Sequence, residues 1–262
     1  MFSELFFDKL PIYIVWLMTA GSIFIMLQVG IQLSRLIFKQ TENSGIGSMT
    51  TGIASLLAFV LAMTFSMAAS KNDSRKQLVL DDANAIGTVY LRSDLLSNTL
   101  SEESKKLLRE YLSLRIDNKS LHKDINQHLQ ASAQIQDKLW KLAISHYQIT
   151  PSLGSTLYIE ALNEMFDIHT TRANKALKSR IPFVIWFALA LLTLFVMILT
   201  GMQIAKHEQR KILLTTVPFA LAFSVILTLI VELDRPTRSV LAVGQDPLIE
   251  LQHSFQESCG EC

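Results

Sequence analysis

The sequence predicts an all-α integral membrane protein with four transmembrane helices and a cytoplasmic helical domain inserted between the second and third spans. Half of its 262 residues are hydrophobic and only 18% are charged, which is apolar for a soluble domain. The apolar residues gather in four blocks, whereas residues 71–180 hold most of the charge, in both signs. That segment contains little Gly or Pro and no alternating β-branched run, so we expect it to be helical.

Each of the four apolar blocks is long enough to cross a hydrocarbon core of ~30 Å as an α-helix rising about 1.5 Å per residue. They cover residues 11–38, 46–70, 181–204 and 212–231. The first block is not expected to be a cleaved signal peptide, because Glu4 and Asp8 outnumber Lys9 before it and its apolar stretch is too long. The predicted parts are the N-terminus and first span (1–45), the second span (46–70), the helical domain (71–180), the third and fourth spans (181–234) and a cytoplasmic C-terminal tail (235–262).

The helical domain is expected to contain four helical pieces. They cover residues 71–96, 101–116, 120–145 and 151–180. No helix breaker separates the first piece from the second span, so a single helix should continue through both. Thr150 and Pro151 suit the cap and first residue of the last piece. In that piece His169 falls on the apolar side, where a hydrogen-bonded core histidine is more common than a ligand or an acid–base group.

The distribution of Lys and Arg near the span ends predicts the orientation in the membrane. About twice as many of these residues lie on the side that holds both termini and the helical domain as on the other side. The short "AKHEQRK" connection, which is rich in Lys and Arg, is an exception because it lies on the other side. We therefore expect a multi-pass protein of the bacterial inner membrane, with both termini and the helical domain cytoplasmic. A net charge of +1 gives no basic face for nucleic acid, so the lipid bilayer is the expected surrounding and nucleic acid is not a partner.

Enzyme motifs are absent from the sequence, so we expect neither catalysis nor a cofactor. "HEQRK" begins like a zinc-protease helix at His207 but has Lys211 where the second histidine must stand. No nucleophile elbow, phosphate-binding loop or dinucleotide glycine pattern occurs. Cys259 and Cys262 form a C-x-x-C pair without two further zinc ligands, and we expect them to lie in a disordered, reduced tail with no metal site.

One line along the second span carries small and hydroxyl-bearing residues with a single aromatic among them. Its members are Gly52, Ser55, Phe59, Ala62, Ser66 and Ser70. The reverse side carries Ile53, Leu57, Val60 and Leu61. Small residues of this kind pack closely against neighbouring helices, which is one interpretation. The other is that the line borders a narrow pathway, in which Phe59 forms a hydrophobic constriction between serine hydroxyls.

Several long segments resemble the bacterial bestrophin-like membrane protein family in the order in which that family has them. They read "LDDANAIGTVYLRSDLL", "LLREYLSLRI", "IEALNEMFDIHTTRANKALKSRIP" and "ELDRPTRSVLAV" followed by "DPLIEL". The likeness covers about residues 52–251 and departs at Ser239, where the family usually has glycine. It implies a bestrophin-like fold and, through the more distant bestrophins, a ring of typically five subunits that conducts small anions along the second span. With this likeness the pathway interpretation is favoured, and the candidate pore-lining residues are Ser55, Phe59, Ala62 and Ser66.

The same resemblance matches a set of polar residues in this sequence. It also matches Asp82 and Gly87, which are not part of the predicted network. We expect a polar network, at the cytoplasmic edge of the membrane, formed by Asn84, Thr88, Arg92, Asn163, Asp167, Arg172, Asp234 and Arg235. The hypothesis is that Asp167 or Asp234 pairs with Arg92 or Arg172 and so fixes how the long helices join. A structural role is favoured over an anion-binding or gating role.

Two functions follow from these observations. The first is an oligomeric channel for small anions, a homo-oligomer that is pentameric by resemblance. The second is a non-conducting membrane scaffold or a stator-like subunit whose cytoplasmic helices recruit a partner, which the polar residues of the first two spans do not exclude. A membrane enzyme ranks third because no catalytic pattern was found.

Overall fold

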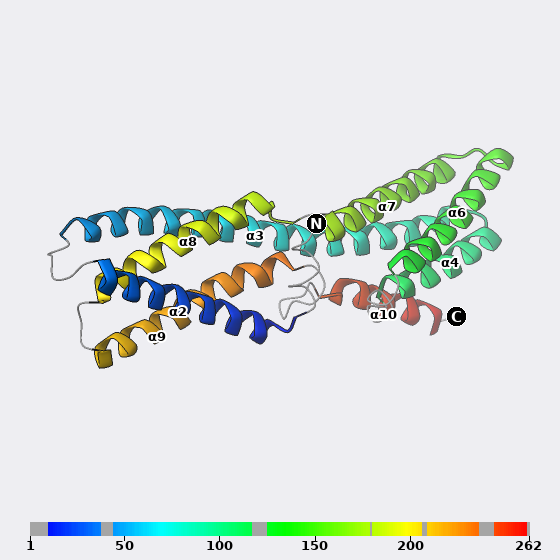
Figure 1. Ribbon diagram of the computed structural model, residues 1–262. Helices are drawn as coiled ribbons and strands as arrows, with labels where there is room; N and C mark the ends of the chain where they lie inside the picture. The colour runs from blue at the N-terminus through cyan, green and yellow to red at the C-terminus, as the bar shows by residue number, and fades with distance from the viewer. Residues whose placement is uncertain are drawn as a thin grey trace. The chain divides into compact units, whose positions relative to one another are not determined.

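In the computed structural model the described residues are 10–37, 44–116, 125–178, 180–205, 209–235 and 244–260, and within them only helices occur. Figure 1 shows their arrangement. The helices are α2 (Ile12–Ile37), α3 (Ser44–Arg92), the short 3₁₀ turn η1 (Ser93–Leu95), α4 (Asn98–Ile116), α6 (Ile125–Ile149), α7 (Leu153–Lys178), α8 (Phe183–Ile204), α9 (Gln209–Asp234) and α10 (Asp246–Gly260).

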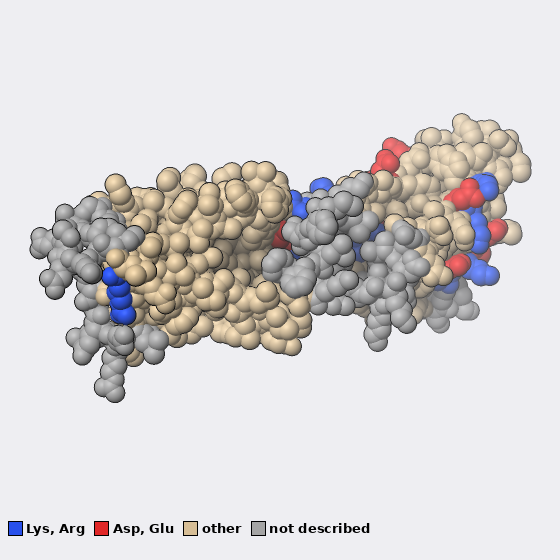
Figure 2. Space-filling view, viewed as in Figure 1, with Lys and Arg blue, Asp and Glu red and all other residues tan. Residues whose placement is uncertain are grey.

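The chain forms two compact units. The first, which we call the transmembrane unit, comprises Met1–Asn72 and Ser179–Ala242; the second unit comprises Asp73–Lys178 and Val243–Cys262. Among the described residues, four helices are long and apolar enough to cross a membrane, as predicted, and all four contribute to the transmembrane unit. Over much of the visible face of this unit, Figure 2 shows neither basic nor acidic residues.

Helices α2 and α8 cross at two glycines where their backbones touch. A Cβ atom added at Gly30 would lie 2.1 Å from the carbonyl oxygen of Ile198, and one added at Gly201 would lie 2.2 Å from that of Leu27. Close approach of this kind is typical of helices packed in a bilayer. There the hydrophobic effect does not drive helices together, and small residues allow the backbones to come into close van der Waals contact. Helix α9 packs on the same α2 helix.

Helix α3 contributes one side to the core of the transmembrane unit. Leu57, Leu61 and Ala68 are buried there against residues of α8 and α9. The helix is 49 residues long and continues past the apolar span to Arg92, which confirms the expectation of one uninterrupted helix. Neither Gly nor Pro occurs between Gly52 and Gly87, so nothing in the sequence stops it.

The second unit is a helical assembly around the later part of α3. Its core joins residues of α3, α4, α6, α7 and α10, and its largest fully buried side chains include Tyr111 and Tyr158. Helix α7 begins at Leu153, where Ser152 and Ser155 cap it reciprocally through backbone N–H to side-chain hydroxyl bonds of 3.1 and 3.0 Å. The predicted cap at Thr150 was therefore wrong by two residues.

The C-terminal segment differs from the disordered tail expected from the sequence. Residues 246–260 form α10, whose Leu248 and Phe255 are buried in the core of the second unit. The ring of Phe255 stacks on that of Tyr90 with centroids 3.8 Å apart. Apolar residues spaced as on one helix face supply the burial that orders this segment. The side chain of Cys259, and all of Cys262, lie outside the described residues.

Candidate functional site: the exposed face of α3 and the buried charges beside it

The predicted line of small residues on α3 lies on the outside of the single chain. Ser55, Phe59, Ala62 and Ser66 are all exposed, and Phe59 has 69% of its surface accessible. The reverse side of the helix, with Leu57 and Leu61, is the one that packs on α8 and α9. Packing within the chain therefore does not explain the line, and whatever covers it comes from outside the protomer.

The polar groups on this face are hydroxyls without a neighbouring charge. Ser55 Oγ donates to the carbonyl oxygen of Thr51 at 2.9 Å, a bond within the helix that leaves the lone pairs of the hydroxyl outward. No Asp or Glu occurs between Ser44 and Asn72, and Asp73 is the first acidic residue that follows. The apolar part of the face thus carries no fixed negative charge.

The charged residues at the end of α9 hold together the helix ends of the transmembrane unit. The backbone N–H of Ile181, just before α8, donates to the Asp234 carboxylate at 2.9 Å. Arg235 donates to the carbonyl oxygen of Leu10, just before α2, at 3.0 Å and lies 3.9 Å from Glu232. All three charged side chains are buried. The abrupt run of charge at the end of an apolar helix therefore serves to connect α2, α8 and α9.

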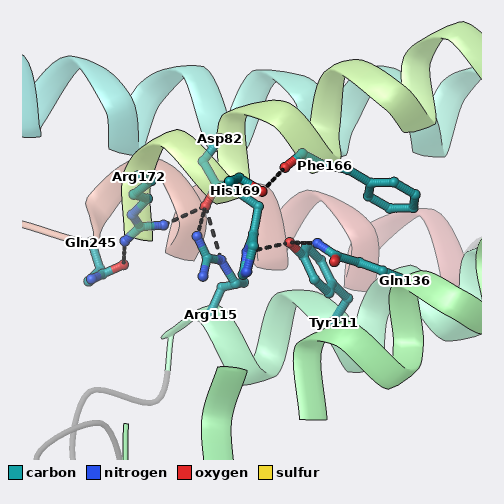
Figure 3. Close-up of polar contacts among 9 residues, drawn as sticks. Asp82, Tyr111, Arg115, Gln136, Phe166, His169, Arg172 and Gln245 are labelled. Carbon is teal, nitrogen blue, oxygen red and sulfur yellow. Dashed lines mark hydrogen bonds and ion pairs between the residues drawn. The ribbon is translucent and has the colours of Figure 1, made fainter. Parts of the chain in front are cut away.

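A second cluster of buried charge lies in the second unit and centres on Asp82 of α3 (Figure 3). The Asp82 side chain is fully buried, and its Oδ2 accepts from Arg115 of α4 at 2.7 Å and from Arg172 of α7 at 2.5 Å. Arg172 also donates to the side chain of Gln245, which precedes α10, at 3.1 Å. One carboxylate and two guanidinium groups thus connect four segments of the chain, with an excess of one positive charge.

Beside these charges, Tyr111 and His169 form a pair of uncharged side chains. His169 Nδ1 is 2.9 Å from Tyr111 Oη, which also accepts from Gln136 of α6 at 3.2 Å. Burial, helped by the Arg115 charge, lowers the pKa of His169 to about 4, and burial raises the pKa of Tyr111 to about 12. Both side chains are therefore uncharged near neutral pH. His169 is the buried, hydrogen-bonded core residue that its position on the apolar side predicted.

The structure corrects the predicted pairing of these charges. Arg172 is paired with Asp82 and not with Asp167, which is exposed. Arg92 donates to the carbonyl oxygen of Leu157 at 2.8 Å, and its nearest carboxylate is Glu160 at 3.9 Å. The Asp167 carboxylate is separated from the buried arginine because its position lies on the polar side of α7.

The other predicted network residues of the second unit lie on its surface. Asn84 and Asn163 are exposed, and Thr88 donates to the carbonyl oxygen of Asn84 within α3 at 2.8 Å. The structure therefore brings together Asp82 and Arg172 among the motif residues, while Asn84, Thr88 and Asn163 take no part in that cluster.

Arg115 was not predicted from the sequence, and Asp82 was predicted as a motif residue without a partner. A signal for both was available. Asp82 lies between Val79 and Ile86 on the apolar side of its helix, where a carboxylate needs a buried partner. Arg115 follows Tyr111 at a spacing of four in the segment "LLREYLSLRI", so both share one side of α4. Among the described residues no group of His, Cys, Asp and Glu is arranged to hold a metal ion.

Comparison with known proteins identifies the family and the fold of the chain. The bestrophin-like domain family matches residues 16–248 of the chain. Crystal structures of two mutants of a bacterial bestrophin homologue from Klebsiella pneumoniae each superpose with a TM-score of 0.64 and cover 95% of this chain and 99% of theirs. At 12% sequence identity this likeness concerns the fold. A search of curated proteins finds no sequence match. The chain, a multi-pass helical membrane protein, belongs to the bestrophin-like family.

Proposed function

We propose that the protein is an oligomeric channel that passes small anions across the bacterial inner membrane, with the exposed face of α3 lining its axis. Family membership and the fold support a channel rather than an enzyme. The second unit and both termini are cytoplasmic in this proposal, on the side favoured by the Lys and Arg residues near the span ends. The assembly is a ring of identical subunits, five by resemblance to bestrophins.

The observation that carries the proposal is the exposure of Ser55, Phe59, Ala62 and Ser66 in the single chain. A face of small and hydroxyl-bearing residues that its own chain leaves uncovered has two uses in a membrane protein: contact with another subunit or the border of an aqueous path. In a closed ring, the helix that turns this face inward supplies one Phe59 per subunit to a common constriction.

Selectivity for anions follows from the charges along this face. Rings of Asp or Glu favour cations, and the described part of α3 carries no acidic residue before Asp73. A serine hydroxyl can donate to a passing anion when it rotates out of its bond to the helix backbone, while the Phe59 side chains narrow the path without adding charge. Asp73 would be the only acidic residue close to the end of the apolar span on this face.

The test is ion flux through the purified protein in liposomes, with chloride and sodium gradients applied separately. Chloride flux above that of empty liposomes is expected, and Phe59→Ala should raise it severalfold because the constriction widens. The matched control is Phe65→Ala, which removes an exposed ring from another side of the same helix and should leave the flux unchanged. Flux of sodium in place of chloride would contradict the anion proposal. If a well-folded ring gave no flux, the channel proposal would be contradicted, and the non-conducting membrane scaffold would be the remaining function.

A further inference from the structure

A cavity of about 510 Å³ lies within the transmembrane unit between α2, α8 and α9. Most of its wall is apolar or aromatic, with Ile23, Phe183, Trp186 and Leu227 among the lining residues. Its dimensions suit a small ligand or a single hydrocarbon chain. Its polar lining groups are the hydroxyls of Thr19, Ser22 and Thr193 and the charged residues at one end.

The charged lining residues stand together at one end of the cavity. Arg180, Asp234 and Arg235 line it where α8 begins and α9 ends. Asp234 binds the backbone of Ile181 and Arg235 binds that of Leu10. Arg180 is partly exposed and belongs to the lining at this end of the cavity. Two further charges stand at this end: Glu232, 3.9 Å from Arg235, and Lys71, whose Nζ donates to the carbonyl oxygen of Arg180. With both included, the charges at this end sum to one positive charge, which suits an anionic group.

The length of the cavity corresponds to one leaflet of a membrane. Along α8 it extends from Phe183 to Thr193, ten positions that rise about 15 Å. The hydrocarbon core of a bilayer is ~30 Å thick, so half of it has the same depth. With Arg180 at the boundary, the apolar part runs toward the bilayer midplane.

We propose that this cavity binds a membrane phospholipid, with one acyl chain between α2, α8 and α9 and the phosphate against Arg180. Arginine binds phosphate through paired N–H donors, and basic positions between transmembrane helices bind anionic lipid head groups. The occupant is a lipid because the cavity combines the depth of one leaflet, apolar walls and a cationic end. This binding site is independent of whether the protein conducts ions.

Trp186 provides a reporter inside the cavity. The protein contains three tryptophans, so replacing Trp16 and Trp140 by phenylalanine leaves only Trp186 fluorescent. In detergent micelles, small additions of phosphatidylglycerol with brominated acyl chains should quench Trp186 in a saturable manner. Arg180→Gln should weaken apparent binding about fivefold, because one cationic contact with an anionic lipid is lost.

Two further variants make the result specific to the cavity. Ala190→Phe fills the cavity from its α8 wall and should abolish the saturable quenching. Leu191→Phe, the neighbouring position outside the lining, is the control and should leave it unchanged. The oligomeric state of each variant is checked by size-exclusion chromatography with light scattering.

Three outcomes would overturn the proposal. Quenching that rises linearly with lipid and is equal in Ala190→Phe would show contact with bulk lipid only. Loss of the oligomer in Ala190→Phe would show that another subunit occupies the cavity. Thr193 lies at the deep end with a buried hydroxyl that has no hydrogen-bond partner. Because an acyl chain has no polar group at that depth, tenfold weaker binding in Thr193→Val would indicate a ligand of different chemistry.

Discussion

Neutralising Asp82 should destabilise the second unit more than removing either arginine that binds it. Asp82 is fully buried, and Arg115 and Arg172 expose only 13% and 15% of their side chains. Asp82→Asn leaves two guanidinium groups side by side without a counter-charge. Breaking a buried ion pair by removing one partner costs about 3–5 kcal/mol. At about 2–4 °C per kcal/mol for a protein of this size, the unfolding temperature should fall by roughly 6–20 °C.

Arg115→Gln is the informative comparison. It removes the bonds of 3.1 and 2.7 Å from Arg115 to Asp82 Oδ2 but leaves a neutral pair of Asp82 and Arg172. The expected cost is about 1.5–3 kcal/mol, the value of hydrogen bonds to a charged group. Asp73→Asn makes the same chemical change at an exposed position of α3, and should stay within about 0.5 kcal/mol of wild type.

The assay is thermal unfolding of the full-length protein in detergent, followed by circular dichroism, with amide hydrogen exchange in α4 and α7 as a local measure. Exchange in both helices should accelerate in Asp82→Asn. If Arg115→Gln proves at least as destabilising as Asp82→Asn, the excess positive charge is not what makes the cluster sensitive to substitution.

Three further predictions concern packing and pH. Gly201→Ala should cost about 1–3 kcal/mol, because its Cβ would lie 2.2 Å from a backbone oxygen of α2, whereas Gly21→Ala, with open space around it, should not destabilise; thermal unfolding distinguishes them. Phe255→Ala should cost about 3–5 kcal/mol by removing the ring stacked on Tyr90, and limited proteolysis should then cut α10; resistance equal to wild type would contradict this. Because burial lowers the pKa of His169 from 6.5 to about 4, the unfolded chain binds this proton more readily, so stability should fall as the pH decreases from 6.5 to about 4. A pH series of unfolding temperatures should show a shallower fall in His169→Gln.

The transmembrane helices and the long α3 helix were predictable because their signals lie in the sequence itself. Apolar length identifies a span whatever surrounds it. The absence of Gly and Pro from most of α3 predicts its continuation. The side of α7 that carries His169 followed from periodicity, since only one side can face the core.

The charge pairs were not predictable in the same way. Every carboxylate on a helix is a possible partner for Arg172, and the choice of Asp82 depends on how α3 and α7 pack. The folding of residues 246–260 into α10 was not predicted, for a related reason. Its burial comes from contact with Tyr90, far away in the chain, and a short amphipathic helix is not stable alone. The start of α7 was misplaced because serines at 152 and 155 satisfy the backbone donors better than Thr150 does.

In the proposed channel, the uncovered face of α3 borders an open axis of the assembled protein. A cryo-electron microscopy map of the purified oligomer in lipid measures this directly. We expect a closed ring in which Ser55, Phe59, Ala62 and Ser66 of every subunit face a continuous opening, narrowest at Phe59. A map in which this face is packed against a neighbouring helix, with no opening along the symmetry axis, would contradict it.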